Sequence, residues 1–272
     1  MINVIKANHQ KEPFSEQKVI ASIQRAGISE SLQNQALQHV KNKLYEGIST
    51  DEIYNHISEF LGKSDRPFSK AKYGLKDAVM ALGPTGYPFE DFVARLLEAI
   101  GYKAQVRQIL NGKCITHEID VIAEKDGKRL MIEAKFHNSP GIRSDVQVAL
   151  YTKARFDDIK MTNKLDNAWI VTNTKTTNDA NTYAACVGMK VISWNFPEGE
   201  GIRDLIEKTR LYPITMLTSL SQNNKQTLLY NHIVLCKDLK ANPSLLDILP
   251  LSKEEKEKTI SEVNFICDQT HD

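Results

Sequence analysis

The chain has 272 residues, of which 41% are hydrophobic and 25% charged, and its formal net charge is +1. This composition is typical of a soluble globular protein and excludes collagen-like or largely disordered chains. A near-neutral chain has no overall attraction to DNA, so any DNA-binding surface must come from local segregation of charge. No stretch is long enough to span a bilayer, and four scattered cysteines without a CxxC pair argue against a zinc site or disulfide framework. We therefore expect a cytoplasmic protein without a membrane partner.

Residues 1–83 are predicted to form a small hairpin followed by helices. The segments "VIK" and "EPF" flank a polar turn. Ser49, followed three residues later by Glu52, has the spacing of a capping box at the start of a helix. The Gly/Pro-rich run "GPTGYP" then predicts a domain boundary. Helices are predicted over residues 16–26, 30–45, 49–61 and 70–82.

Residues 84–199 alternate between helical and extended patterns, which predicts a mixed sheet flanked by helices. The order is αβββαβ, followed by one more helix and strand. Helices are expected over 89–101, 145–157 and 178–188, and strands over 103–109, 115–123, 129–136, 168–174 and 190–194. The last part, residues 200–272, has Leu and Ile at helical spacing and predicts a helical C-terminal domain, with one helix over 221–240. The expected class is therefore multidomain α+β.

The segment "EIDVIAEKDGKRLMIEAKF", residues 118–136, predicts a β-hairpin that turns at "DG". The register set by this turn places Asp120 opposite Glu133 and Glu118 opposite Lys135. Side chains alternate along a strand, so these four share one face and His117 lies on the other, where a structural role is expected.

Carboxylates directly opposite each other lie about 4.5–5.5 Å apart at Cβ and repel, unless a cation lies between them or one keeps its proton. A divalent metal ion is the simplest resolution. Because the available ligands are oxygens, Mg²⁺ or Mn²⁺ is favoured over zinc. The alternative is that Asp120 and Glu133 lie at the solvated ends of their strands.

The pattern Asp120…Glu133-Ala-Lys135 resembles the signature of the PD-(D/E)XK nuclease superfamily. The stretches "FEDFVARLLEAIGY", "HEIDVIA" and "MIEAKF" resemble its Mrr-type branch, which acts in type IV restriction. The resemblance implies that Asp120 and Glu133 bind the metal ion, and that Glu90 completes its ligand shell. It also implies that Lys135 orients or deprotonates the attacking water, or offsets charge in the transition state.

Gln147 and Tyr151 are four residues apart and so share one face of the expected helix, and Arg155 continues this stripe. The pair resembles the QxxxY element of RecB-like nucleases, which implies that both side chains contact the scissile phosphate. The alternative is an ordinary polar helix face.

The segment "VIKANHQKEPFSEQKVIASIQRAG" with the later "GISTDEI" resembles the ATP-cone, a nucleotide-sensing domain. The resemblance implies that ATP or dATP is bound by Lys6, by the segment from Glu12 to Lys18, and by Thr50. Lysines near a helix N-terminus suit a triphosphate. The chain has no Walker A motif, which favours sensing over a motor function. The alternative is a helical domain that only mediates self-association, and a homo-oligomer is expected in either case.

The sequence thus predicts a metal-dependent DNA endonuclease regulated by ATP or dATP, acting in type IV restriction or DNA repair. A first alternative is a catalytically silent nuclease fold that acts as a nucleotide-sensing DNA-binding regulator. A second is an interaction scaffold without a nucleic-acid role. The intact set of Asp120, Glu133 and Lys135 favours the enzyme. The three expected domains cover residues 1–83, 84–199 and 200–272.

Overall fold

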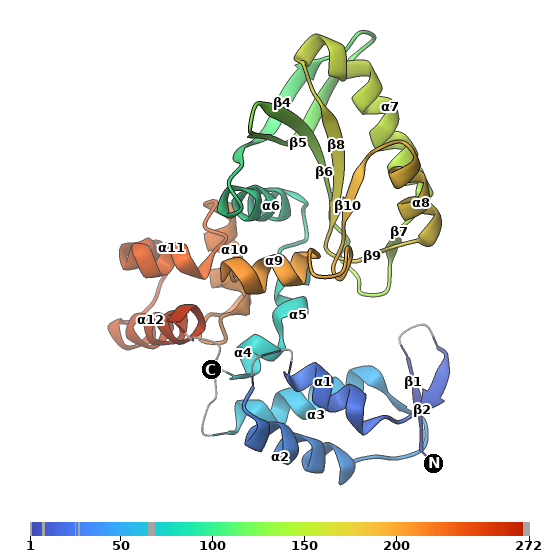
Figure 1. The fold of residues 1–272 in the computed structure, drawn as a ribbon. Coiled ribbons are helices and arrows are strands. Elements are labelled where there is room, and N and C mark those ends of the chain that lie inside the picture. The colour runs from blue at the N-terminus through green and yellow to red at the C-terminus, as the bar shows by residue number, and fades with distance from the viewer. Residues whose placement is uncertain (1, 7–8, 25, 27, 65–68, 269–272) are drawn as a thin grey trace.

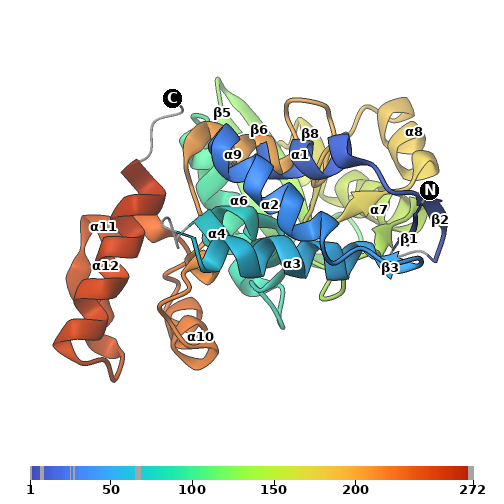
Figure 2. The same cartoon turned by 90° about the horizontal axis from the view of Figure 1, so that it is seen from below.

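The computed structural model describes residues 2–6, 9–24, 26, 28–64 and 69–268 (Figure 1). Residue 25, near the end of the first predicted helix, lies outside the described residues. The mixed α+β character expected from the sequence is confirmed. Within the described residues, no helix has both the length and the apolar character needed to cross a membrane. The N-terminal domain lies below the main sheet in Figure 1. Figure 2 shows the C-terminal helices α10 (Gln222–Tyr230), α11 (Cys236–Ala241) and α12 (Lys253–Asp268) to one side of the N-terminal domain.

The N-terminal domain is a small sheet packed with helices around its own core. Strand β1 pairs antiparallel with β2 and parallel with β3. The side chain of Ser49 accepts a hydrogen bond of 3.0 Å from the backbone N–H of Glu52, so the predicted N-cap is confirmed. Ile23, Ile48 and Leu61 are fully buried in this core. The elements are β1 (Asn3–Ile5), β2 (Lys11–Pro13), α1 (Glu16–Gln24), α2 (Glu30–Lys41), β3 (Ile48–Ser49) and α3 (Thr50–Gly62).

Two short helices, α4 (Ser69–Tyr73) and α5 (Leu75–Met80), connect this domain to the main sheet. The single helix predicted over 70–82 is wrong, because the chain breaks at Gly74. Glycine is a poor helix former, so the helix is interrupted there. The position of α5 is then set by its contacts with other parts of the chain. The Oγ1 of Thr215 donates a hydrogen bond of 2.6 Å to the carbonyl of Ala78, which anchors α5 to the C-terminal segment.

The main sheet has five strands in the order β10-β8-β6-β5-β4. Strands β4, β5 and β6 form an antiparallel meander, whereas β6, β8 and β10 are parallel. Helix α6 packs on one face, and α7 and α8 pack on the other. The elements are α6 (Tyr87–Ala99), β4 (Lys103–Asn111), β5 (Thr116–Lys125), β6 (Lys128–Lys135), β7 (Arg143–Ser144), α7 (Val146–Asn163), β8 (Asn167–Thr172), β9 (Lys175–Thr176), α8 (Asn178–Cys186) and β10 (Lys190–Ile192).

The hairpin between β5 and β6 has the turn that its sequence predicts. Asp126 and Gly127 have φ angles of 52° and 74°, as the favoured two-residue turn requires. The predicted register is confirmed near the turn, where the ladder begins with the pair Lys125 and Lys128.

The C-terminal segment is helical and shares one apolar core with the sheet and α6. Leu97 of α6, Val121 of β5, and Leu228 and Ile266 belong to this same cluster. The single helix predicted over 221–240 is wrong. The structure has two helices there, one that ends at Tyr230 and one that begins at Cys236. In the chain between them, Leu235 forms a β-bridge with Pro213. The elements are α9 (Ile202–Thr209), η1 (Ile214–Met216), α10 (Gln222–Tyr230), α11 (Cys236–Ala241), η2 (Pro243–Ile248) and α12 (Lys253–Asp268).

Candidate active site

Asp120 lies where the sheet is interrupted. The ladder between β4 and β5 passes over Arg107 and Asp120 without pairing them, and Arg107 has a φ of 51°, which residues other than glycine rarely adopt. The ladder between β5 and β6 ends at Val121, next to Asp120. The carboxylate of Asp120 instead accepts a hydrogen bond of 2.7 Å from the backbone N–H of Ala134. The interruption therefore directs Asp120 toward the strand that carries Glu133.

This bond replaces the direct pairing of Asp120 with Glu133 that the turn predicted. The predicted pairing of Glu118 with Lys135 is also absent from the ladder. The pairing is lost beside Arg107, whose φ of 51° distorts β4 directly opposite Asp120, although the register of β4 and β5 is the same on both sides of the interruption. The charged residues nonetheless remain close enough for their charges to interact.

Glu133 is paired with a cation supplied by the fold itself. Its side chain is only 14% exposed and forms an ion pair with Arg155 of α7, whose side chain is 11% exposed. Burial, together with the charge of Asp120, raises the pKa of Glu133 to about 7. Burial also raises the pKa of Asp120. Arg155 therefore supplies some of the positive charge that two opposed carboxylates require.

Glu90 lies on α6, on the opposite face of the sheet from α7, and is close enough to Asp120 for their charges to interact. Burial and the charge of Asp120 raise the pKa of Glu90 to about 7. A nitrogen of Arg107 lies 3.2 Å from the Glu90 carboxylate, and its other terminal nitrogen lies 2.6 Å from that of Asp91. The interruption that leaves Asp120 unpaired thus also places Arg107 beside both acids of α6.

The donor set fits Mg²⁺ or Mn²⁺ through two carboxylates. Asp120 and Glu133 offer oxygen ligands, and Mg²⁺ is commonly held by one or two carboxylates together with water and phosphate oxygens. Among the described residues, no three His, Cys, Asp or Glu side chains form a group that could hold a metal ion. The completion of the ligand shell by Glu90 therefore stays a prediction.

The remaining predicted residues lie around this pair. Lys135 ends β6 and is two residues beyond Glu133, on the same face of the strand. Gln147 and Tyr151 are exposed on α7, one turn apart. The guanidinium of Arg155 lies 5.3 Å from the centre of the Tyr151 ring, so this stripe of α7 borders Glu133.

His117 contacts α7, as Glu133 does through Arg155, so both lie on the α7 side of the sheet and the predicted placement of His117 on the opposite face is wrong. Nε2 of His117 is 2.8 Å from the carboxylate of Asp158, a contact that joins β5 to α7. The contact is of a structural type, although it lies on the face of the sheet that Glu133 shares. Strand alternation is broken near Asp120, since Ile119 and Ile122 both pack on the α7 side.

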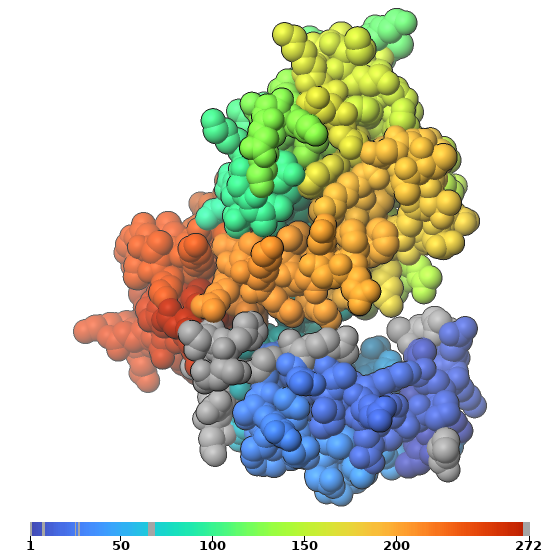
Figure 3. Space-filling model, in the orientation of Figure 1, coloured from blue at the N-terminus to red at the C-terminus, as the bar shows by residue number. Residues whose placement is uncertain are grey.

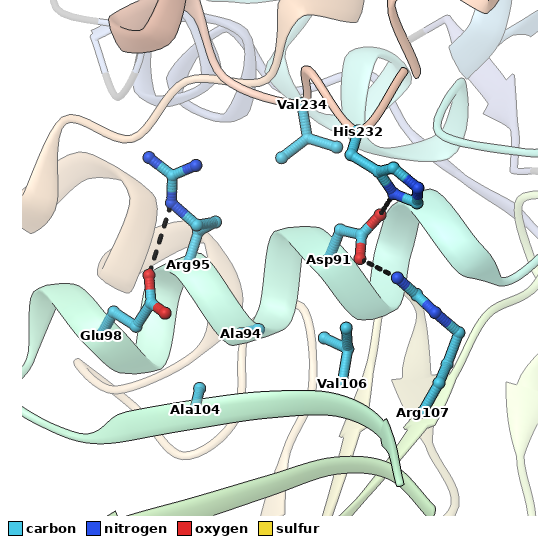
Figure 4. Close-up of a pocket in the computed structure, with 9 residues that line it drawn as sticks. All are labelled: Asp91, Ala94, Arg95, Glu98, Ala104, Val106, Arg107, His232 and Val234. Carbon is cyan, nitrogen blue, oxygen red and sulfur yellow. Dashed lines mark hydrogen bonds and ion pairs between the residues drawn. The ribbon is translucent and has the colours of Figure 1, made fainter. Parts of the chain in front are cut away.

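The C-terminal segment adds residues to the surroundings of the site that the sequence did not indicate. A pocket of about 330 Å³ lies between α6, β4 and the segment after α10 (Figure 4). In Figure 4, Asp91 points toward both His232 and Arg107, and its carboxylate is 2.9 Å from Nδ1 of His232. A neighbouring pocket of about 440 Å³ shares these three residues and adds Glu118 and Tyr230. No motif in residues 200–272 signals this contact, because it arises from packing.

The predicted nucleotide-binding residues fall into two linked places. Nζ of Lys6 lies 2.6 Å and Nζ of Lys18 lies 2.9 Å from the same carboxylate oxygen of Glu12. Hydrogen bonds from these two lysines lower the pKa of Glu12. Lys6 and Thr50 line a cavity of about 740 Å³ between the N-terminal domain and the main sheet, whereas Glu12 and Lys18 are not part of its lining.

Three family models match the chain: an ATP cone domain over residues 2–75, a restriction endonuclease domain over 83–198, and an "AF1548-like, C-terminal" domain over 212–267. A protein of Archaeoglobus fulgidus described as uncharacterized is 41% identical over 175 residues, which are 64% of this chain and 99% of the relative. The crystal structure of a protein of unknown function, AF1548, has 39% identity and a TM-score of 0.59, and the match covers 67% of this chain and 98% of that one. The chain therefore belongs to the AF1548-like family, and it carries an ATP cone domain ahead of its restriction endonuclease domain.

Proposed function

We propose that the protein is a metal-dependent DNA endonuclease that responds to ATP or dATP bound by its N-terminal domain. The observation that carries this proposal is the partly buried pair of Asp120 and Glu133 beside Lys135. Burial raises the pKa of both carboxyl groups, and such a pair costs folding free energy unless a cation compensates it. Binding of a metal ion by this pair is a functional reason for the protein to retain it despite the loss of folding free energy.

In this proposal Asp120 and Glu133 hold Mg²⁺ or Mn²⁺, with Glu90 as a further ligand. The bound ion supplies charge stabilisation for the phosphate and a more acidic water. Lys135 orients or deprotonates the attacking water, or offsets the charge that develops on the phosphate. Gln147 and Tyr151, exposed on α7, contact the scissile phosphate.

The surface beside the acidic residues supports DNA as the substrate. Tyr87 and Tyr230 are 55% and 87% exposed, and both line the 440 Å³ pocket together with Arg107 and Glu118. Exposed aromatic rings near a cation suit nucleic acid, because unpaired bases stack on the rings and phosphates interact with the cation. We infer that DNA passes over this pocket, so that the C-terminal segment contributes to substrate binding.

One observation favours the second candidate, a silent nuclease fold that senses nucleotide and binds DNA. The ion pair between Arg155 and Glu133 already provides a cation at the carboxylate that the nuclease proposal assigns to the metal. A regulator that needs no metal would keep this ion pair whenever it binds DNA. The nuclease would have to exchange it for the metal ion.

The test is a plasmid-nicking assay with Mg²⁺ or Mn²⁺, with and without ATP, using the wild type and Glu133→Ala. Glu124→Ala is the matched control, because Glu124 is exposed on the same hairpin. We expect cleavage by the wild type and the control and none by Glu133→Ala, and the ATP arm gives the sign of regulation. If the wild type leaves unmodified, methylated and branched DNA intact but shifts DNA in a gel, the regulator replaces the nuclease.

A further inference from the structure

A cavity of about 740 Å³ lies between the N-terminal domain and the restriction endonuclease domain. Its size is within the range of small-molecule sites. Figure 1 shows the β1–β2 hairpin facing the end of the main sheet where β7 and β9 lie, and Figure 3 shows a hollow between the two domains. The N-terminal side is lined by Lys6, Gln10, Thr50 and Asp51, and the other side by Lys76, residues 140–143, Thr174 and Lys175.

The lining carries more positive than negative charge. Lys6, Lys76, Arg143 and Lys175 are cationic, and Asp51 is the acid among the lining residues. Lys6 is paired with Glu12, but Lys76, Arg143 and Lys175 form no ion pair in the part of the chain that the structure describes. A cavity with such an excess of fixed cations suits a multiply charged anion.

Two of these cations are close enough to repel each other. Lys76 is partly buried on α5, and its pKa is lowered first by burial and then by the charge of Lys175. The charges of Asp51 and Asp77 offset part of this effect. Holding like charges together costs free energy, and an anion placed between them would remove that cost.

The ligand that fits both halves of the cavity is a nucleoside triphosphate. Lys6 and Thr50, which the likeness to ATP-cones assigns to nucleotide contact, line this cavity, and Thr50 is the first residue of α3, where free backbone N–H groups attract phosphate. We propose that the phosphates of this nucleotide reach across the cavity to Lys76, Arg143 and Lys175, so that the restriction endonuclease domain supplies part of the nucleotide site. The proposal rests on nucleotide binding by the N-terminal domain in the proposed function.

A nucleotide held in this way would contact the segment that leaves the candidate active site. Arg143 pairs with Lys175 in the two-stranded sheet of β7 and β9. The hydroxyl of the next residue, Ser144, is 2.9 Å from Nε2 of His137. His137 follows Lys135 by two residues in the chain. Phosphates bound at Arg143 and Lys175 would therefore restrain the loop that begins at Lys135.

The test is calorimetric titration of ATP and AMP into the full chain without DNA. We expect Arg143→Ala and Lys175→Ala each to weaken ATP affinity about tenfold, which is the usual strength of one charge-assisted contact. AMP affinity should change less, because its single phosphate does not span the cavity. The matched control is Lys128→Ala, an exposed lysine at the hairpin turn, which should bind ATP like the wild type.

A second measurement locates the contact directly. Hydrogen–deuterium exchange of residues 137–143 should slow when ATP is added to the wild type, and this protection should be lost in Lys175→Ala. Protection restricted to the N-terminal domain would overturn the proposal. Both readouts are independent of DNA cleavage, so a chain that fails as a nuclease still gives an answer here.

Three further outcomes would also overturn the proposal. The first is ATP affinity unchanged in Arg143→Ala and Lys175→Ala but reduced in Lys6→Ala, because the N-terminal domain would then hold the nucleotide alone. The second is the absence of ATP binding by the wild type. The third is weakened DNA binding in both variants with unchanged ATP affinity, which would assign these cations to the phosphates of DNA.

Discussion

The candidate active site and the cavity between the domains handle charge in opposite ways. At the active site the acids have partners within the fold, since Arg155 pairs with Glu133 and Arg107 pairs with Glu90 and Asp91. In the cavity, the charge of Lys175 acts against that of Lys76, and the charges of Asp51 and Asp77 offset only part of this effect. A site whose charges are balanced internally must give up ion pairs to bind its ligand. A site with excess positive charge is stabilised by an anion without losing an ion pair. We therefore expect the cavity to bind its anion more readily than the active site binds its metal ion.

The largest effect should come from the lysine of the acidic site. Lys135→Ala should lower the rate of DNA cleavage by about 10²–10³-fold, as the loss of one group that stabilises transition-state charge commonly does. Single-turnover cleavage rates measure this, with a thermal melt to show that the fold is retained. Cleavage at the wild-type rate would remove Lys135 from the reaction.

The next effect tests whether the acids really depend on an internal cation. Arg155→Met should reduce the free energy of unfolding of the metal-free protein by about 3 kcal/mol above pH 7, because it leaves a buried carboxylate without its partner. Added Mg²⁺ should restore part of this loss, since ligands that bind only the folded state stabilise it. Denaturant titration of the variant gives both values.

Arg210→Met is the control for that experiment, because Arg210 is exposed at the end of α9. Equal stability of Arg155→Met and Arg210→Met without metal would contradict the claim that Arg155 compensates the charge of Glu133.

The cavity should respond to an anion that has no nucleoside. Inorganic tripolyphosphate at about 100 times its Kd should stabilise the wild type by about 2.7 kcal/mol, as linkage requires for a ligand that binds only the folded state. Thermal melts in the presence of a chelator measure this effect. The double variant Arg143→Ala, Lys175→Ala should lose most of the stabilisation. An equal gain in both proteins would mean that the anion binds elsewhere.

The smallest effect concerns pH. Burial and the charge of Asp120 raise the pKa of both Glu90 and Glu133 to about 7, so the folded state holds protons that the unfolded state has released. The contribution of these two groups to stability is therefore greatest at low pH and is lost as the pH rises from about 5 to 7. Melting curves without metal should show this slope, and Glu90→Gln should flatten it. Parallel slopes for variant and wild type would contradict the assigned pKa.

The sequence predicted correctly those parts of the fold whose conformation is set by residues adjacent in the chain. The turn residues Asp126 and Gly127 set the register of the hairpin, and Ser49 marks the start of α3. The helix breaks at Gly74 and after Tyr230 were missed, because long-range packing decides there between two locally acceptable paths.

The candidate site was predictable as a group of residue types but not as an arrangement. The spacing of Asp120, Glu133 and Lys135 indicates the chemistry. However, the distortion at Arg107 changes how Asp120 is held, and no pattern of residue types in the sequence marks its position. The need for a cation was visible from the opposed carboxylates, whereas its supply by Arg155 depends on how α7 packs against β6.

The apolar core shared by the sheet and the C-terminal helices has a consequence for how such chains evolve. Leu97 and Ile266 belong to one cluster, whereas the N-terminal domain has a separate core around Ile23 and Leu61. A segment with its own core can be gained, lost or exchanged between lineages as an independent module. The helices after residue 201 do not meet that condition, so they must be inherited together with the sheet on which they pack.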